Sequence, residues 1–254
     1  MWALIEKGLE HNGLVTAFAF VGVVMWISVV LSKRLTFGRV HGSAIAIVIG
    51  LVLAWVGGTM TGGQKGLADI SLFSGIGLMG GAMLRDFAIV ATAFEVQATE
   101  ARKAGMIGVI ALLLGTILPF IVGASMAWVF GYRDAISMTT IGAGAVTYIV
   151  GPVTGAAIGA SSEVMALSIA AGLIKAILVM VMTPFVAPLI GLNSPRSAVI
   201  FGGLMGTSSG VAGGLAATDP KLVPYGCLTA AFYTALGCLL GPSLLYVMVR
   251  GLVG

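Results

Sequence analysis

The sequence predicts an all-α polytopic membrane protein with about eight transmembrane spans, and two observations predict it. Apolar side chains make up 59% of the 254 residues and charged side chains only 9%, whereas a soluble domain carries about 25% charged residues. Most of the chain falls into apolar stretches of roughly 20 residues, which as helices cross a hydrocarbon core of about 30 Å. We therefore expect a single integral membrane domain over residues 1–254.

The eight expected spans follow one another along the whole chain. The loop after the first span holds Lys33, Arg34 and Arg39, and by the positive-inside rule this loop is cytoplasmic. Both ends of the chain are then expected outside. The spans cover residues 13–32, 43–58, 70–94, 104–130, 136–160, 164–190, 198–217 and 224–250.

Two of these spans are poor helix formers. The span 136–160 holds five glycines and the pair Gly151-Pro152, and the span 198–217 holds six glycines and the cluster Thr207-Ser208-Ser209. An interior glycine costs about 1 kcal/mol relative to alanine, and an interior proline about 3 kcal/mol. Broken backbone at membrane depth is tolerated only inside protein or beside a water-filled cavity. We therefore predict two discontinuous helices of the kind that bind substrate and ions in secondary transporters.

The spacing of glycine and proline also indicates an internal repeat. Gly155 and Pro184 lie 29 positions apart, and so do Gly213 and Pro242. In each case a glycine-rich span is followed by a short polar stretch and then by an apolar span that reaches the proline. We interpret this as a degenerate repeat of a two-span unit, whose copies run parallel in the membrane because two spans separate them.

Three charged residues fall inside the expected spans, away from their terminal residues. A charge at the bilayer centre costs at least about 2.5 kcal/mol and usually faces a cavity or a partner. Lys175 lies near the middle of its span, which favours a functional role. Arg85 and Asp86 are adjacent in the third span, and snorkelling to the inner membrane surface explains Arg85 as well as substrate binding does.

The sequence excludes several other classes of protein. Residues 206–210 read G-T-S-S-G and match the nucleophile elbow of hydrolases, but the only histidines, His11 and His41, flank the first span. Cys227 and Cys238 are eleven positions apart in one expected helix, so they are too distant for a disulfide. The basic residues are scattered over the loops, which excludes a nucleic-acid partner.

Two long segments resemble a known family. They read LFSGIGLMGGAMLRDFAIVATAFEVQATEARKAG and TIGAGAVTYIVGPVTGAAIGASSEVMALSIAAGLIKA, and they resemble the larger membrane subunit of the two-component malonate:sodium symporter over essentially the whole chain. This resemblance implies uptake of malonate with sodium, a smaller membrane subunit as partner, and a multi-pass location in the bacterial inner membrane. The basic loop after the first span then places the N-terminus in the periplasm. The resemblance implies neither an enzymatic activity nor an organic cofactor.

Malonate is a compact dianion at neutral pH, and half-helix N-termini and small hydroxyl donors suit such a ligand. We expect Lys175 or Arg85 to supply the countercharge, Asp86 to couple a cation, and backbone carbonyls near Gly151 and Gly210 to bind sodium. The other residues expected to line the substrate site come from the two discontinuous spans: Thr147, Gly151, Thr154, Thr207, Ser208, Ser209 and Gly210.

Two alternative functions stay open at this point. The chain is also consistent with the membrane subunit of a sodium-translocating decarboxylase, which is an enzyme component. A holin-like or exporter-type membrane subunit without a small-molecule substrate is the other alternative.

Overall fold

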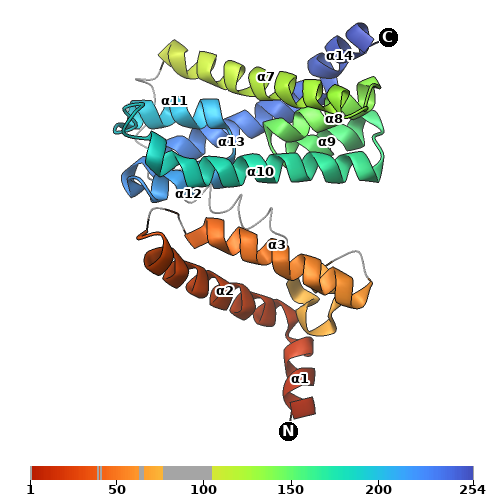
Figure 1. Cartoon of the computed structure of the whole chain (residues 1–254), viewed down its shortest axis with the longest axis vertical. Helices are drawn as coiled ribbons and strands as arrows, with labels where there is room; N and C mark the ends of the chain where they lie inside the picture. Colours follow the sequence, from red (N-terminus) through yellow and green to blue (C-terminus); the bar gives the residue numbers. More distant parts are fainter. Residues whose placement is uncertain (1, 39, 41, 63–65, 77–104, 254) are drawn as a thin grey trace. The chain divides into compact units, whose positions relative to one another are not determined.

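The computed structural model describes residues 2–38, 40, 42–62, 66–76 and 105–253. The described residues are helical, with no strand among them. The chain divides into two compact units, Met1–Val90 and Ala91–Gly254, and Figure 1 gives the order of their helices.

The first unit is a pair of long apolar helices with a short helix before them. Helix α2 (Gly13–Leu35) packs against α3 (Gly42–Thr61), and α1 (Trp2–His11) precedes them. Two 3-10 turns, η1 (Gly66–Asp69) and η2 (Ser71–Phe73), follow α3. Helices α2 and α3 correspond to the first two predicted spans. The predicted third span begins at Ile70, the residue before η2, and residues 77–94 of that span lie outside the described residues.

The second unit combines long helices with pairs of short ones (Figure 1). Its long helices contact the short ones on several sides, since α7 packs against α8 and α11, and α10 packs against α8, α9 and α12. A 3-10 turn, η3 (Pro220–Leu222), precedes α13, and a π-helical turn, η4 (Gly241–Leu245), joins α13 to α14. The α-helices are α7 (Gly105–Val129), α8 (Ala135–Val146), α9 (Val150–Ile158), α10 (Ser162–Val186), α11 (Pro195–Met205), α12 (Ser208–Ala216), α13 (Val223–Leu240) and α14 (Tyr246–Val253).

Each pair of short helices is separated by two or three residues of non-helical backbone. Helix α8 ends at Val146, and Thr147 is extended, with φ −152° and ψ 157°. Helix α11 ends at Met205, and Gly206 has φ 69° and ψ −10°, a left-handed conformation that glycine adopts without steric cost. We call residues 147–149 the first break and residues 206–207 the second break.

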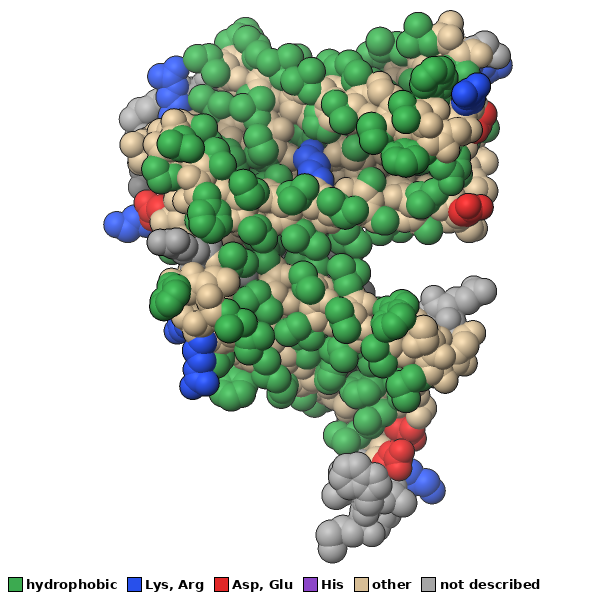
Figure 2. All heavy atoms as spheres, in the orientation of Figure 1, with side chains coloured by type: hydrophobic (Ala, Val, Ile, Leu, Met, Phe, Trp, Pro, Cys, Tyr) green, Lys and Arg blue, Asp and Glu red, His purple; other side chains and the backbone are tan. Residues whose placement is uncertain are grey.

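Five segments of the described chain are long and apolar enough to cross a membrane: Gly13–Leu35, Ala44–Phe73, Gly105–Val129, Ser162–Val186 and Pro220–Val253. Exposed large apolar side chains occur along all five segments, and apolar side chains cover much of the surface that Figure 2 shows. Continuous apolar surfaces of this kind are unfavourable in water, whereas the hydrocarbon core of a membrane accommodates them. The protein is therefore an all-helical, multi-pass membrane protein.

The second unit contains the internal repeat that the glycine and proline spacing predicts. The order short helix, break, short helix, long helix occurs first in α8–α10 and again in α11–α13. Gly144 lies against the backbone of Ser168, and 58 positions further along the chain Gly202 lies against the backbone of Gly226. A Cβ on either glycine would overlap the facing backbone. The same close helix contact is thus made once in each copy.

Candidate functional site

The side chain of Lys175, a residue of α10, reaches the C-terminal end of the short helix α8. Its Nζ donates hydrogen bonds to the carbonyl oxygen of Val146, at 2.8 Å, and to the hydroxyl of Tyr233, at 3.0 Å. Val146 is the last residue of α8, so its carbonyl has no amide one turn further along the helix. Since a helix C-terminus carries partial negative charge, the ammonium of Lys175 stabilises the first break.

Tyr233 is fully buried in α13 and links Lys175 to α7. Its hydroxyl donates to the carbonyl oxygen of Gly115 at 2.6 Å. In a regular helix this carbonyl would accept from the amide of residue 119, but that residue is Pro119, which has no N–H. Tyr233 therefore satisfies a carbonyl that Pro119 leaves free, and its single proton is committed to Gly115.

The second break also contacts Tyr233. Gly206 lies directly against the Tyr233 ring, and a Cβ on Gly206 would overlap three of the ring's atoms. The carbonyl oxygens of Gly203 and Leu204, at the end of α11, lie against Gly115. The C-terminal ends of α8 and α11 therefore adjoin one group of residues, which we call the Lys175 cluster: Gly115, Val146, Lys175 and Tyr233.

The N-terminal end of α12 presents hydrogen-bond donors that an acceptor can bind. Thr207 is its N-cap and makes no side-chain capping hydrogen bond. Within the described part of the chain the fully buried Thr207 hydroxyl has no hydrogen-bond partner, and its methyl lies against Gly210. The amides of residues 208–210 also have no carbonyl partner within their own helix. Such a helix end favours a carboxylate or another anion.

This end of α12 packs against α10 at the residue that follows Lys175 in the sequence. Gly210 packs against the carbonyl oxygen of Ala176, and a Cβ on Gly210 would lie 2.7 Å from that oxygen. Ala176 directly follows Lys175 in α10. Ser208 is buried and Ser209 half-buried at the same helix end, so two hydroxyl groups accompany the amides.

The N-terminal end of α9 differs, because its amides already have partners. The Thr147 hydroxyl accepts from the amides of Ile149, at 3.1 Å, and Val150, at 3.2 Å. The amide of Gly151 donates to the Thr147 carbonyl at 3.3 Å, and Pro152 has no N–H. The sequence suggests equal roles for the two breaks, but among the described residues only the second break presents donors without a partner.

The remaining predicted site residues lie apart from this helix end or outside the described residues. Thr154 is fully buried further along α9, where its hydroxyl lies against Gly241 of η4. That hydroxyl is also without a hydrogen-bond partner in the part of the chain described. Arg85 and Asp86 fall within residues 77–104, which are outside the described residues.

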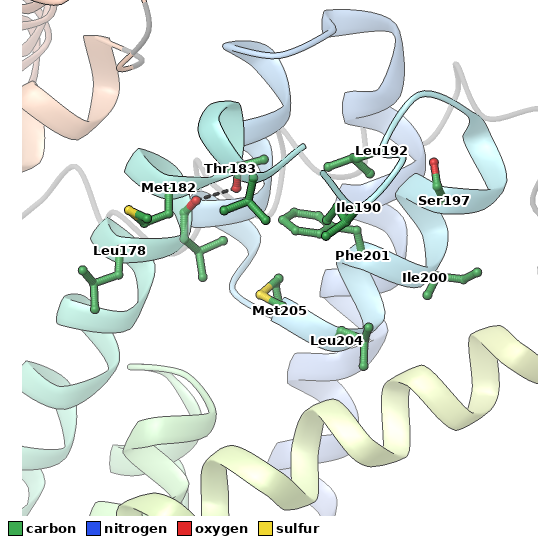
Figure 3. Close-up of a pocket in the computed structure, with 12 residues that line it drawn as sticks. Leu178, Met182, Thr183, Ile190, Leu192, Ser197, Ile200, Phe201, Leu204 and Met205 are labelled. Atoms are coloured by element: carbon green, nitrogen blue, oxygen red, sulfur yellow. Dashed lines mark hydrogen bonds between the residues drawn. The ribbon is translucent and has the colours of Figure 1, made fainter. Parts of the chain in front are cut away.

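A large apolar cavity lies between the C-terminal half of α10 and α11 (Figure 3). Its volume is about 590 Å³, and its lining includes Leu178, Met182, Phe201 and Met205. The hydroxyl of Thr183, one of its polar lining groups, is engaged with the carbonyl of Val179. None of the predicted site residues that the structure describes lines this cavity. Its apolar walls do not suit a dianion.

A polar hollow of about 410 Å³ lies where α8 begins, lined in part by Arg133, Asp134, Tyr246 and Arg250. Asp134 is the N-cap of α8, and its carboxylate accepts from the amide of Ser137 at 2.8 Å. Slight burial acts to raise the pKa of Asp134, but the hydrogen bonds from Ser137 and its neighbours outweigh this effect, so the pKa is lowered.

Short helices that meet at breaks around a half-buried lysine, within a set of long apolar helices, are the features of a multi-pass membrane transport protein. The sequence model of the family described as "Malonate/sodium symporter MadM subunit" matches residues 5–253. The chain belongs to this family, so it is a membrane subunit of a malonate/sodium symporter, with sodium as the coupling ion. No curated protein and no solved structure matches the chain.

Proposed function

We propose that this chain is the subunit that translocates malonate, and that it binds the substrate at the second break. The observation that carries the proposal is the N-terminus of α12, where the first amides and the Thr207 hydroxyl lie together and have no hydrogen-bond partner among the described residues. In transporters with discontinuous helices, half-helix N-termini bind the anionic groups of the substrate. Malonate has two carboxylates, and this helix end suits one of them.

Lys175 is the proposed countercharge for malonate. Lys175 precedes Ala176, whose carbonyl contacts Gly210, and its ammonium binds the hydroxyl of Tyr233, whose ring contacts Gly206 of the second break. Ser208 and Ser209 supply hydroxyl donors to the same ligand, while Thr147, Gly151 and Thr154 border the first break. Arg85 is the second candidate for the countercharge, and Asp86 the candidate for cation coupling.

We further propose that each pair of short helices forms one discontinuous span, α8 with α9 and α11 with α12. Together with the five long segments and the span expected over residues 70–94, they give eight crossings. The basic loop after α2, with Lys33 and Arg34, then lies in the cytoplasm of a bacterium, and the N-terminus lies in the periplasm.

The smaller membrane subunit is proposed as an obligatory partner. Family membership supports a symporter subunit rather than the membrane subunit of a decarboxylase or a holin-like protein. The test is sodium-dependent uptake of labelled malonate into liposomes that contain this chain with or without the smaller subunit. We expect uptake only with both subunits present. Full uptake by this chain alone would contradict the proposed partnership, and no malonate uptake by the pair would contradict the proposed function.

A further inference from the structure

We propose that Lys175 occupies the position of the coupling cation: the oxygen atoms that bind its ammonium form a sodium site, and sodium displaces the ammonium toward the substrate. The sodium site stands on the geometry of the Lys175 cluster alone. The transfer of Lys175 to a carboxylate rests, in addition, on the malonate site proposed above.

The first oxygen of this site is the carbonyl of Val146. It belongs to the last residue of α8, and the chain is extended immediately after it. Half-helix C-termini and unwound carbonyls are the groups that bind sodium in transporters with discontinuous helices. In this structure the carbonyl binds an ammonium at 2.8 Å. A group that binds one monovalent cation in this way suits another.

The second oxygen is the hydroxyl of Tyr233. Its proton is directed to Gly115, at 2.6 Å, so its lone pairs face Lys175. Pro119 enforces this orientation, because it leaves the Gly115 carbonyl without an amide donor. The hydroxyl is thus fixed as an acceptor before any cation arrives, and it lies 3.4 Å from the Val146 oxygen.

The displaced ammonium has a stronger partner available beside α12. Both oxygens that hold Lys175 are uncharged, and an ammonium binds a carboxylate more strongly than a neutral oxygen. A cation at Val146 repels the ammonium, whereas a carboxylate at the open end of α12 attracts it. Sodium and malonate therefore favour each other's binding through Lys175, and by linkage each raises the affinity of the other by the same factor.

Sodium binding in the absence of malonate tests the site directly. The sample is the purified complex of this chain with the smaller subunit, titrated with sodium chloride against choline chloride in a calorimeter. Lys175→Met removes the competing ammonium, so we expect sodium affinity to rise about tenfold or more, the equivalent of one charge-assisted hydrogen bond. Lys175→Arg keeps a cation there and should not raise it. Lys221→Met, at an exposed lysine, is the matched control and should leave sodium binding unchanged.

Unchanged or weaker sodium binding by Lys175→Met would overturn the proposal. If this variant does not assemble, Tyr233→Phe decides instead. It keeps the ring against Gly206 and removes the acceptor oxygen, so sodium affinity should fall several-fold while the complex stays assembled. Sodium binding that is insensitive to Tyr233→Phe would equally overturn the proposal.

Malonate titrations with and without sodium test the coupling. We expect sodium to increase malonate affinity in the unaltered complex, and this increase to be absent in Lys175→Met. An equal increase in both proteins would overturn the role of Lys175 in coupling. The failure of the malonate site is distinguishable, because it would abolish malonate binding and leave the sodium titrations unaffected.

Discussion

Lys175 and Tyr233 are equivalent residues of the two repeat copies, and they bind each other. They are 58 positions apart, the same offset that relates Gly144 to Gly202, and the Lys175 Nζ lies 3.0 Å from the Tyr233 hydroxyl oxygen. One copy therefore contributes a cation and the other a hydroxyl to the Lys175 cluster, which lies beside both breaks. The degenerate repeat supplies the geometry, and the difference between the copies supplies the chemistry.

Removing the Ser208 hydroxyl should weaken malonate binding. A neutral hydrogen bond contributes about 1 kcal/mol and one to a charged group about 1.5–3 kcal/mol, so Ser208→Ala should lower malonate affinity roughly tenfold or more. Calorimetric titration of the complex with malonate in sodium buffer measures this loss. Gly50→Ala in α3, where an added Cβ meets nothing within 4 Å, is the control. Equal affinities for the two variants would place the substrate elsewhere.

Gly210→Ala is a less suitable probe than helix propensity alone suggests. By propensity the substitution should favour a continuous helix by about 1 kcal/mol. However, the added Cβ would lie 2.7 Å from both the Ala176 oxygen and the Thr207 methyl. We therefore expect Gly210→Ala to destabilise the protein as well as to weaken binding, which thermal unfolding without ligand would detect. An increase in melting temperature would contradict this expectation.

Thr207→Val should separate stability from function. The Thr207 hydroxyl is fully buried without a partner in the described structure, and a buried hydroxyl in that state costs about 1–3 kcal/mol. The isosteric valine should therefore raise the melting temperature of the complex while malonate uptake falls. Thr116→Val is the control, because the Thr116 hydroxyl already donates to the Leu112 carbonyl. Normal uptake by Thr207→Val would remove this hydroxyl from the site.

Pro119→Ala should stabilise α7 and impair sodium coupling. The substitution restores an amide that competes with Tyr233 for the Gly115 carbonyl, and an interior proline costs a helix about 3 kcal/mol. The Tyr233 hydroxyl then loses its fixed orientation as an acceptor. We expect a higher melting temperature together with a several-fold weaker sodium affinity. If sodium affinity stays the same, the orientation of Tyr233 does not depend on the proline.

Asp134 should give α8 a stability that depends on pH. Its pKa is lowered in the folded protein, so the unfolded chain binds the proton more tightly. The contribution is therefore complete above the unfolded pKa of about 3.9 and is lost as the pH falls through the folded value. Asp134→Asn retains a capping side chain without the charge. The melting temperature of Asp134→Asn should thus depend less on pH between about pH 4 and pH 2 than that of the unaltered protein.

The sequence by itself determined the helical membrane class and the family. It predicts interruptions at Gly151-Pro152 and at the Thr207-Ser208-Ser209 cluster, and the non-helical residues of this structure are 147–149 and 206–207. Apolar stretches of membrane-spanning length predict α2, α3, α7 and α10 within a few residues, because hydrophobicity and helix length are local properties. A helix accommodates proline best in its first turn, and in this structure Pro152 lies in the first turn of α9. Glycine at position 206 allows the left-handed end of α11.

Only the tertiary structure decided which of the polar groups are free to bind a ligand. Thr147 and Thr207 each lie in one of the two breaks. The Thr147 hydroxyl accepts from the amides of Ile149 and Val150, whereas the Thr207 hydroxyl has no partner in the described chain. Nothing in the sequence marked Tyr233 as a site residue. Its role depends on the carbonyl of Gly115, 118 positions earlier in the chain, which Pro119 leaves without an amide donor. Hydrogen bonds between distant helices depend on packing, and packing is not a local property of the sequence.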